Sequence, residues 1–285
     1  MDIPPILPVE PKAPPAEALP PPIKRWRWSI HLLVIASYPL LIGVLALFFG
    51  ESQGPALTSD AKGLLVVCLE QMILFGIFFG VAWAASRASR DDLLWRWRGG
   101  FLTVPLGIGY SIALRALVAL LAGIVVVLLL VVGVFTLESL QEYVTTNRPK
   151  VETIVDVPAM RQNPVYYWLT LTVVSFGFAG FREELWRVAV LAGLQKLWPG
   201  IFASRLGQFG AVAVAAIIFG FGHLGQGVLA VGMTAILGFG LGAIMVFHRS
   251  IWPAVIAHGM FDATSLALIP WVLEMLQQAQ KTTGH

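Results

Sequence analysis

Long apolar blocks separated by short polar stretches make up most of the chain. They fall at residues 28–50, 63–86, 101–136, 165–197, 206–223, 226–247 and 250–275. A helix needs about 20 apolar residues to cross the hydrocarbon core of a bilayer. The third and fourth blocks are long enough for a span plus a surface helix or a broken helix. The pattern therefore predicts an all-α, polytopic transmembrane helical bundle with seven or eight spans.

Composition supports the same class of protein. Of the 285 residues, 57% are hydrophobic and 12% are charged, and mean hydropathy is +0.78. Soluble domains carry about 25% charged residues, so a disordered chain and an ordinary soluble globule are excluded, and no nucleic-acid partner is expected. The single cysteine, Cys68, excludes an internal disulfide framework and a cysteine-based zinc cluster.

The distribution of Lys and Arg predicts the orientation in the membrane. Most of them flank the blocks on one side: Lys12, Lys24, Arg25, Arg27, Arg87, Arg90, Arg96, Arg98, Lys196, Arg205 and Arg249. The other side has fewer: Lys62, Arg148, Lys150, Arg161 and Lys281. Because cytoplasmic loops carry the excess of Lys and Arg, the first set and the N-terminus should be cytoplasmic. We expect an integral protein of the lipid bilayer, in a bacterial inner (plasma) membrane.

Several charged or titratable side chains lie inside the apolar blocks. They are Arg182, Glu183, Glu184 and Arg187 in the fourth block, His223 in the fifth, and His258 and Asp262 in the last. A charge at the bilayer centre costs about 2.5–3.5 kcal/mol, so such residues call for partners or a function. At about 1.5 Å per residue from the basic ends, Glu184, Asp262 and His223 lie about 18, 20 and 27 Å deep. We expect them to meet in one polar cavity within the membrane.

Three motifs carry a resemblance to a known family. They are Phe181-Arg182-Glu183-Glu184-Leu185-Trp186-Arg187, then Phe219 to His223, then Ser250-Ile251-Trp252-Pro253 leading to His258 and Asp262. In this order, and all in apolar helices, they resemble the CPBP (CAAX protease and bacteriocin-processing, Abi) family of intramembrane endopeptidases, which includes the type II CAAX prenyl proteases. The resemblance covers roughly residues 165–270.

The resemblance implies the activity and the roles of the residues. A Glu and the first His activate water for attack on a peptide carbonyl, and the second His with Asn or Asp stabilises the oxyanion. The catalytic candidates are thus Glu183, Glu184, His223, His258 and Asp262, with Arg187 and Phe219 as orienting residues. The partner would be a membrane-associated peptide or protein substrate. No cofactor and no metal are expected, since a zinc-binding His-Glu-xx-His motif is missing, although two His and several carboxylates leave zinc as an alternative.

Composition, the apolar blocks and the resemblance together divide the chain into four parts: a flexible Pro-rich cytoplasmic tail (1–25), N-terminal transmembrane helices (26–160), a catalytic transmembrane core (161–275) and a short C-terminal tail (276–285).

Two positions depart from the family pattern Glu-Glu-xxx-Arg and His-xxx-Asn/Asp. Only two residues separate Glu184 from Arg187. If the motif is aligned on Arg187 without a gap, Glu183 is favoured as base, since it shares a helix face with Arg187 four residues later. If the motif is aligned on the Glu pair instead, Glu184 is favoured. The other departure is Asp262, where many members have Asn. An ionised Asp cannot donate a hydrogen bond to an oxyanion, so it would orient His258 or act protonated.

Other classes of function stay open from the sequence alone. Buried acids and histidines also serve transporters and proton relays, and the register departure also fits a non-catalytic membrane scaffold or immunity protein. Gly238 and Gly242 have the spacing of close helix packing. Glu70 and Arg115 are candidates for an ion pair, and His31 is expected to be incidental.

Overall fold

The structure, a computed structural model, describes residues 24–49, 58–149 and 154–283. Within these ranges the chain is helical and contains no strand. The α-helices are α1 (Arg25–Phe49), α2 (Ala61–Ser86), α3 (Thr103–Val131), α4 (Leu137–Asn147), α5 (Val157–Gln162), α6 (Pro164–Leu169), α7 (Glu184–Leu197), α8 (Pro199–Phe202), α9 (Arg205–Phe221), α10 (Val228–His248) and α11 (Trp252–Thr283). Two short 3₁₀-helices, η1 (Gly100–Leu102) and η4 (Leu224–Gln226), and one π-helix, η3 (Thr170–Glu183), complete them. Of the predicted Pro-rich tail (1–25), residues 1–23 lie outside the described residues, and Arg25 already begins α1.

Five helical segments of the described chain are long and apolar enough to cross a membrane. They are Ala61–Ser86, Gly100–Val131, Pro164–Leu197, Val228–His248 and Trp252–Val272. The predicted segments 28–50 and 206–223 are also helical, as α1 and α9, but neither is among the five, and α9 has only 17 residues. The all-helical membrane class is therefore confirmed, while seven or eight spans stay a prediction.

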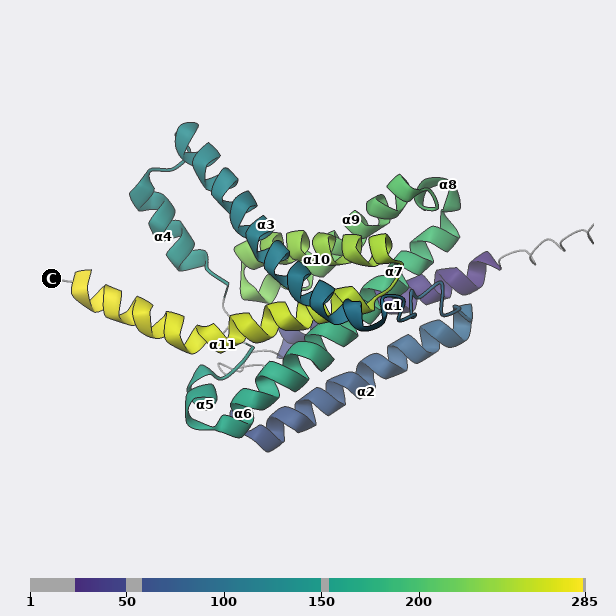
Figure 1. The fold of residues 1–285 in the computed structure, drawn as a ribbon, viewed down its shortest axis with the longest axis horizontal. Coiled ribbons are helices and arrows are strands. Elements are labelled where there is room, and N and C mark those ends of the chain that lie inside the picture. The colour runs from purple at the N-terminus through teal and green to yellow at the C-terminus, as the bar shows by residue number, and fades with distance from the viewer. Residues whose placement is uncertain (1–23, 50–57, 150–153, 284–285) are drawn as a thin grey trace, which may run out of the picture.

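Helix α7 forms the centre of the bundle and carries two of the predicted site residues. Every side chain from Glu184 to Leu194 is buried. The helix packs against α1, α9, α10 and η3, and Figure 1 shows α1 and α2 on one side of it and α9 and α10 on the other. A helix that is buried on all sides exposes no face to water. Glu184 and Arg187 therefore need partners of opposite charge inside the protein.

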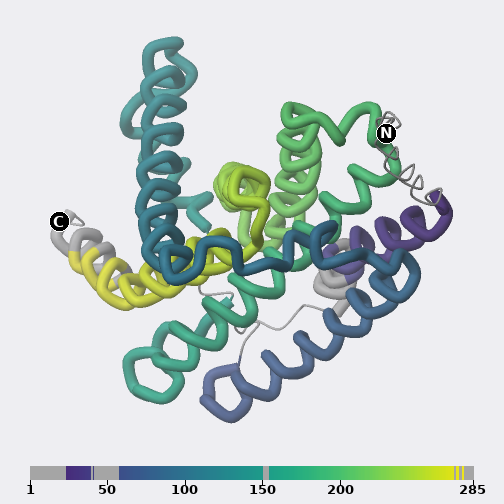
Figure 2. Tube along the Cα trace, turned by 45° about the vertical axis from the view of Figure 1, so that its right-hand side comes forward, coloured from purple at the N-terminus to yellow at the C-terminus, as the bar shows by residue number. Residues whose placement is uncertain are grey.

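Helix α3 joins the bundle by its first half only. Its buried residues are Thr103, Gly107, Ser111, Leu114 and Val118, and this half packs along α11. The second half extends away from the bundle (Figure 2), and α4 runs back from its far end toward the bundle (Figure 1). The side chains of that half, Leu120 to Val131 among them, are mostly exposed and apolar, as contact with lipid requires.

The start of α11 is held by the connection between α2 and η1. Pro253 lies in the first turn of α11, where its missing N–H is not needed, as the sequence predicts. Just before it, the Ser250 hydroxyl donates to Arg96 O at 2.8 Å and Ile251 N donates to Leu94 O at 3.0 Å. Beyond the apolar block α11 continues to Thr283, because residues 271–283 contain neither Gly nor Pro.

The same connection also holds the far end of α7. Lys196 Nζ lies 2.8 Å from Asp92 Oδ1, and the backbone N–H and hydroxyl of Ser89 donate to Asp92 Oδ2. Burial of Asp92 opposes its ionisation, but the bonds from Lys196 and Ser89 outweigh burial and hold the pKa of this carboxyl below its ordinary value. The end of α7 nearest the predicted cytoplasmic surface is thus tied by charge to the loop after α2.

The glycines of α10 allow it to approach α7 and α9. A Cβ at Gly238 would lie 3.0 Å from the Phe219 ring, and one at Gly242 would lie 2.7 Å from Val212. Both would also come within 3.4 Å of the Arg187 side chain. The predicted close packing at these glycines is confirmed, and the space they leave is occupied by Arg187.

A glycine on the α9 side of this packing gives a test. A Cβ at Gly220 would lie 2.7 Å from Val231 O and 2.9 Å from the Ala235 side chain. Gly220→Ala is therefore expected to destabilise the fold by about 1–3 kcal/mol, since backbone atoms cannot move aside. Thermal unfolding in detergent measures the effect. Gly232→Ala in α10, where nothing lies within 4 Å of the new Cβ, is the control, and equal melting of both variants would contradict the packing.

Candidate active site

The two glutamates lie where the helix changes type. η3 is a π-helix up to Glu183, and α7 begins at Glu184. Within η3 the Ser175 hydroxyl donates to Thr170 O, five residues back, at 3.0 Å. π-helical geometry inside an α-helix is rare and is frequent at functional sites. The uniform α-helix assumed for Phe181–Arg187 is therefore wrong, and the register of the two carboxylates follows from this junction.

Glu184 is fully buried between a cation and an imidazole. Its Oε1 forms an ion pair with Arg187 Nη1, which is also fully buried, and lies 2.7 Å from His258 Nδ1. The prediction that Arg187 pairs with Glu183 across four residues is wrong, because Arg187 contacts Glu184 three residues before it. The junction between η3 and α7 turns Glu184, not Glu183, toward Arg187.

Glu183 lies closer to the edge of the same cluster. Its carboxyl side chain is 18% exposed, its Oε1 accepts from Arg182 Nη2 at 3.1 Å, and its Oε2 lies 3.9 Å from His258 Nε2. Arg182 in turn lies over the Phe178 ring, 3.5 Å from its centroid, and reaches Tyr38 Oη of α1 at 3.4 Å. Glu183 is thus the less buried carboxylate, and it borders the second nitrogen of the imidazole that Glu184 holds.

His258 connects three carboxylates. Its Nδ1 faces Glu184, and its Nε2 lies 3.9 Å from Glu183 and 3.7 Å from Asp262 Oδ2, one turn further along α11. A carboxylate at 2.7 Å from Nδ1 keeps a proton there, so Nε2 is free to accept in the neutral ring or to donate in the charged one. Asp262 is 29% exposed on its side chain and lies where it stabilises the charged ring.

His223 approaches from the end of α9. Its Nδ1 lies 2.9 Å from Phe219 O, so this nitrogen carries the proton and donates to the carbonyl. In the neutral ring Nε2 then holds the lone pair and is an acceptor. The Phe219 ring lies between the two histidines, with its centroid 4.6 Å from that of His223 and 6.4 Å from that of His258. Arg187 lies over the same ring at 4.5 Å.

The charges of the cluster balance. Three carboxylates, Glu183, Glu184 and Asp262, face three guanidinium groups, Arg182, Arg187 and Arg115. Glu183, His223, His258 and Arg115 all act electrostatically on Asp262. A balanced set is the condition under which ionised groups persist in a low-dielectric interior. Four of the predicted site residues, Glu183, Glu184, His258 and Asp262, are thus in direct contact, and His223 lies beside them across the Phe219 ring.

The arrangement of the His, Cys, Asp and Glu side chains among the described residues bears on metal binding. In the described ranges, no group of three or more His, Cys, Asp or Glu side chains has an arrangement that could hold a metal ion. Glu184 is engaged by Arg187 and by His258 Nδ1. The expectation of no metal stays a prediction, and no chemical step is derived through a zinc ion.

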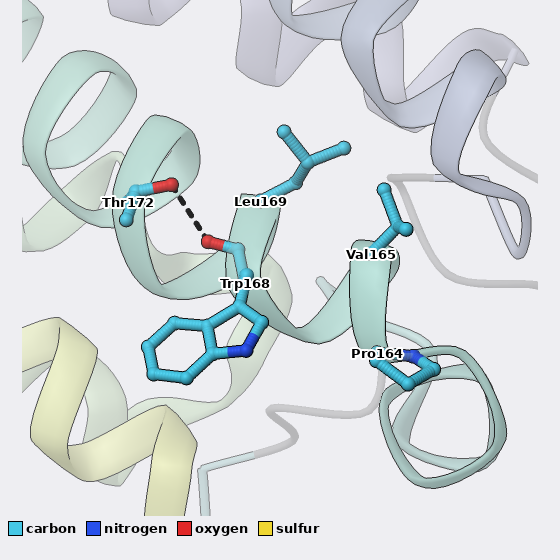
Figure 3. A pocket seen from close by; sticks show the side chains of 5 residues that line it. All are labelled: Pro164, Val165, Trp168, Leu169 and Thr172. Carbon is cyan, nitrogen blue, oxygen red and sulfur yellow. Dashed lines mark hydrogen bonds between the residues drawn. The ribbon is translucent and has the colours of Figure 1, made fainter.

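Two cavities of the described chain lie away from the carboxylate cluster. One, of about 300 Å³, is lined by Pro164, Val165, Trp168, Leu169 and Thr172 at the start of the α6–η3–α7 segment (Figure 3). Figure 3 shows the Thr172 hydroxyl bonded to the backbone oxygen of Trp168, at 2.6 Å. None of these residues belongs to the carboxylate cluster. The predicted polar cavity at Glu183 and Glu184 stays a prediction.

Comparison with known proteins identifies the segment that carries the cluster. Residues 164–264 match the family model described as type II CAAX prenyl endopeptidase Rce1-like. This part of the chain is similar to the Rce1-like family. No curated protein and no solved structure gives a match. The resemblance inferred from the three motifs is thereby confirmed.

The Rce1-like segment contains the whole cluster predicted from the sequence. Glu183, Glu184, His223, His258 and Asp262 lie between its limits. The family indicates a protease, and with five apolar helices of spanning length the chain is an integral membrane protein. Helices α1–α5 precede the matched segment, yet α1 supplies Tyr38 and α3 supplies Arg115 to the surroundings of the site.

Sequence reasoning missed two residues around the Rce1-like segment. His31 is fully buried, with Nδ1 3.0 Å from Ala82 O of α2 and Nε2 3.0 Å from Ala189 O of α7. The expectation that His31 is incidental is wrong, since it joins α1 to two other helices. Arg115 makes no pair with Glu70 as predicted, but bonds to α11. A single Arg in an apolar helix indicates from the sequence that a partner exists. The sequence did not show that this partner lies on α11.

Proposed function

We propose that the chain is an intramembrane endopeptidase that hydrolyses peptide bonds of membrane-associated substrates with a water activated by Glu and His. The observation that carries this proposal is that Glu183 and Asp262 both lie within 3.9 Å of His258 Nε2, inside an apolar bundle, in a segment similar to the Rce1-like family. Glu184 and Arg187 form a fully buried ion pair next to these groups. The two charges compensate each other, and neither engages the Glu183 carboxylate.

In the first step Glu183 acts as general base. It removes a proton from a water whose other hydrogen bond is accepted by His223 Nε2, the free nitrogen of the ring held by Phe219 O. The water oxygen bonds to the carbonyl carbon of the peptide, and the carbonyl oxygen becomes an oxyanion. Glu183 suits this role better than Glu184 because its carboxylate is partly exposed and not paired with Arg187.

In the second step the oxyanion is stabilised and the peptide bond breaks. Charged His258 donates from Nε2 to the oxyanion, and Asp262, ionised, stabilises the imidazolium instead of donating itself. Glu184 fixes the orientation of the ring through Nδ1, as a carboxylate does for a catalytic histidine. The carbon–nitrogen bond then breaks, and the proton held by Glu183 passes to the leaving amine.

The substrate class follows from the family and from the environment. The family description names CAAX prenyl endopeptidases, so we propose a CAAX-type C-terminus, with leader-peptide processing as the alternative. In both cases the substrate is a peptide held at the bilayer. The scissile bond would reach the cluster from the cytoplasmic leaflet.

Cleavage by the purified chain tests the function and the absence of a metal together. The protein is reconstituted into vesicles with a membrane-tethered reporter peptide that ends in a prenylated CAAX sequence or in a leader sequence. We expect cleavage that withstands a chelator, and elemental analysis without stoichiometric zinc. Activity lost to the chelator and restored by zinc would defeat the glutamic mechanism. No cleavage of either reporter would favour a scaffold or a relay.

Orientation in the membrane is a separate prediction. The Arg-rich connection after α2 should face the cytoplasm, with the N-terminus on the same side. In a Cys68→Ala background, Arg90→Cys, on an exposed residue of this connection, should react with an impermeant maleimide from the cytoplasmic side only. Gln141→Cys, exposed on α4, is the matched control and should react from the opposite side. The reverse labelling pattern would move the proposed substrate entrance to the other leaflet.

A further inference from the structure

Arg115 is the only charged residue of α3, and the proposed mechanism does not use it. A charged side chain in a span costs about 2.5–3.5 kcal/mol unless it is compensated. Part of the compensation is local, since Nη1 donates to Ser111 O at 3.0 Å and to Ser111 Oγ at 2.6 Å. The rest comes from a different helix, α11.

The contacts of Arg115 with α11 surround Asp262. Nη2 donates to Phe261 O at 2.5 Å and to the Thr264 hydroxyl, and lies 3.4 Å from Met260 O and from Ser265 Oγ. The guanidinium also lies over the Phe261 ring, 4.3 Å from its centroid. One side chain therefore bonds to the residues on both sides of Asp262.

The packing of α3 fixes this geometry. Eight residues before Arg115, Gly107 approaches α11 so closely that a Cβ there would lie 2.5 Å from Ile256. Ile256 in turn lies eight residues before Thr264, so the two helices run in the same direction with matched rise. Two contacts on one helix face leave α11 little freedom to rotate about its axis.

The positive charge of Arg115 also affects the carboxylates of the site. Arg115 and Asp262 attract each other, while Glu183 repels Asp262 and the charged His258 attracts it. Without Arg115, two carboxylates, Glu183 and Asp262, would share a low-dielectric region in which Arg187 is paired with Glu184 and Arg182 with Glu183, so that only His258 would face Asp262. Repulsion between them would displace either carboxylate from His258 Nε2.

We infer that Arg115 is a positioning residue of the proposed peptidase site, which anchors α11 around Asp262 and balances the charge of the Asp262 carboxylate beside Glu183 and His258. The inference rests on the proposed function. It assigns a part in that function to α3, which lies outside the segment of the Rce1-like family.

The test is a rescue experiment on reporter cleavage. Arg115→Gln should lower kcat about 10- to 100-fold with little change in KM, since misplacement of reacting groups by about 1 Å costs up to 10²-fold. Arg115→Lys keeps the charge and should retain most of kcat. Arg115→Gln combined with Asp262→Asn should recover to within a few-fold of Asp262→Asn alone, because the uncompensated carboxylate is gone. Arg205→Gln, which makes the same change on an exposed residue at the start of α9, is the control and should change kcat little.

The outcomes separate this inference from the function on which it rests. Arg115→Gln could lower kcat equally in the wild-type protein and in the Asp262→Asn variant, together with a lower melting temperature. Arg115 would then have only a structural role, and the proposed function would stand while the inference would be overturned. Full activity of Arg115→Gln would overturn it too. A wild-type protein that cleaves neither reporter would overturn the proposed function and the inference with it.

Discussion

Glu183→Gln should lower reporter cleavage by about 10²–10⁴-fold, the usual contribution of a general base. The substitution keeps the size of the side chain and removes the carboxylate that lies 3.9 Å from His258 Nε2. Little loss of stability is expected, because this side chain is at the edge of the cluster and partly exposed. The measurement is kcat in reconstituted vesicles, with the amount of protein in the membrane fraction determined in parallel.

Companion variants separate the base from its neighbours. His223→Ala should be as severe as Glu183→Gln if it holds the water, and Asp262→Asn should be mild, since many members of the family carry Asn there. Glu184→Gln should lose activity together with stability, because it removes the partner of Arg187. Inactivity of Glu184→Gln alone, with an active Glu183→Gln, would transfer the role of base to Glu184. Wild-type rates for all of them would make the cluster structural.

The largest effect on stability is expected from Arg187→Met. It leaves the fully buried Glu184 carboxylate without its cation, and breaking a buried ion pair on one side typically costs about 3–5 kcal/mol. Thermal unfolding in detergent measures the loss. Arg205→Met, on an exposed residue at the start of α9, is the matched control and should change little.

A double variant checks the reason for that loss. Arg187→Met combined with Glu184→Gln removes both charges and should recover part of the stability, since an unpaired buried charge costs more than an absent pair. A single variant that melts like the wild type would show that the pair does not stabilise the fold. A double variant no more stable than the single one would assign the loss to packing against Gly238, Gly242 and Phe219 instead.

The sequence by itself determined the class of fold and the composition of the site. Each of the seven predicted apolar blocks is helical, because apolar runs of this length leave the backbone no other way to satisfy its hydrogen bonds in lipid. The candidate residues also follow from sequence, since charges such as Glu184 and Asp262 are too costly in apolar helices without partners. Counting residues from the basic ends was enough to predict that they meet.

Only the tertiary structure decided which groups pair with which. The sequence pattern assumes one helical period, and the π-helix up to Glu183 changes that period at the point where the two carboxylates diverge. As a result Arg187 contacts Glu184, and Glu183 is left for His258 Nε2 and Arg182. Arg115 and His31 show the same limit, because their partners are backbone carbonyls of other helices. A carbonyl acceptor has no side-chain signature, so its position is set by helix packing alone.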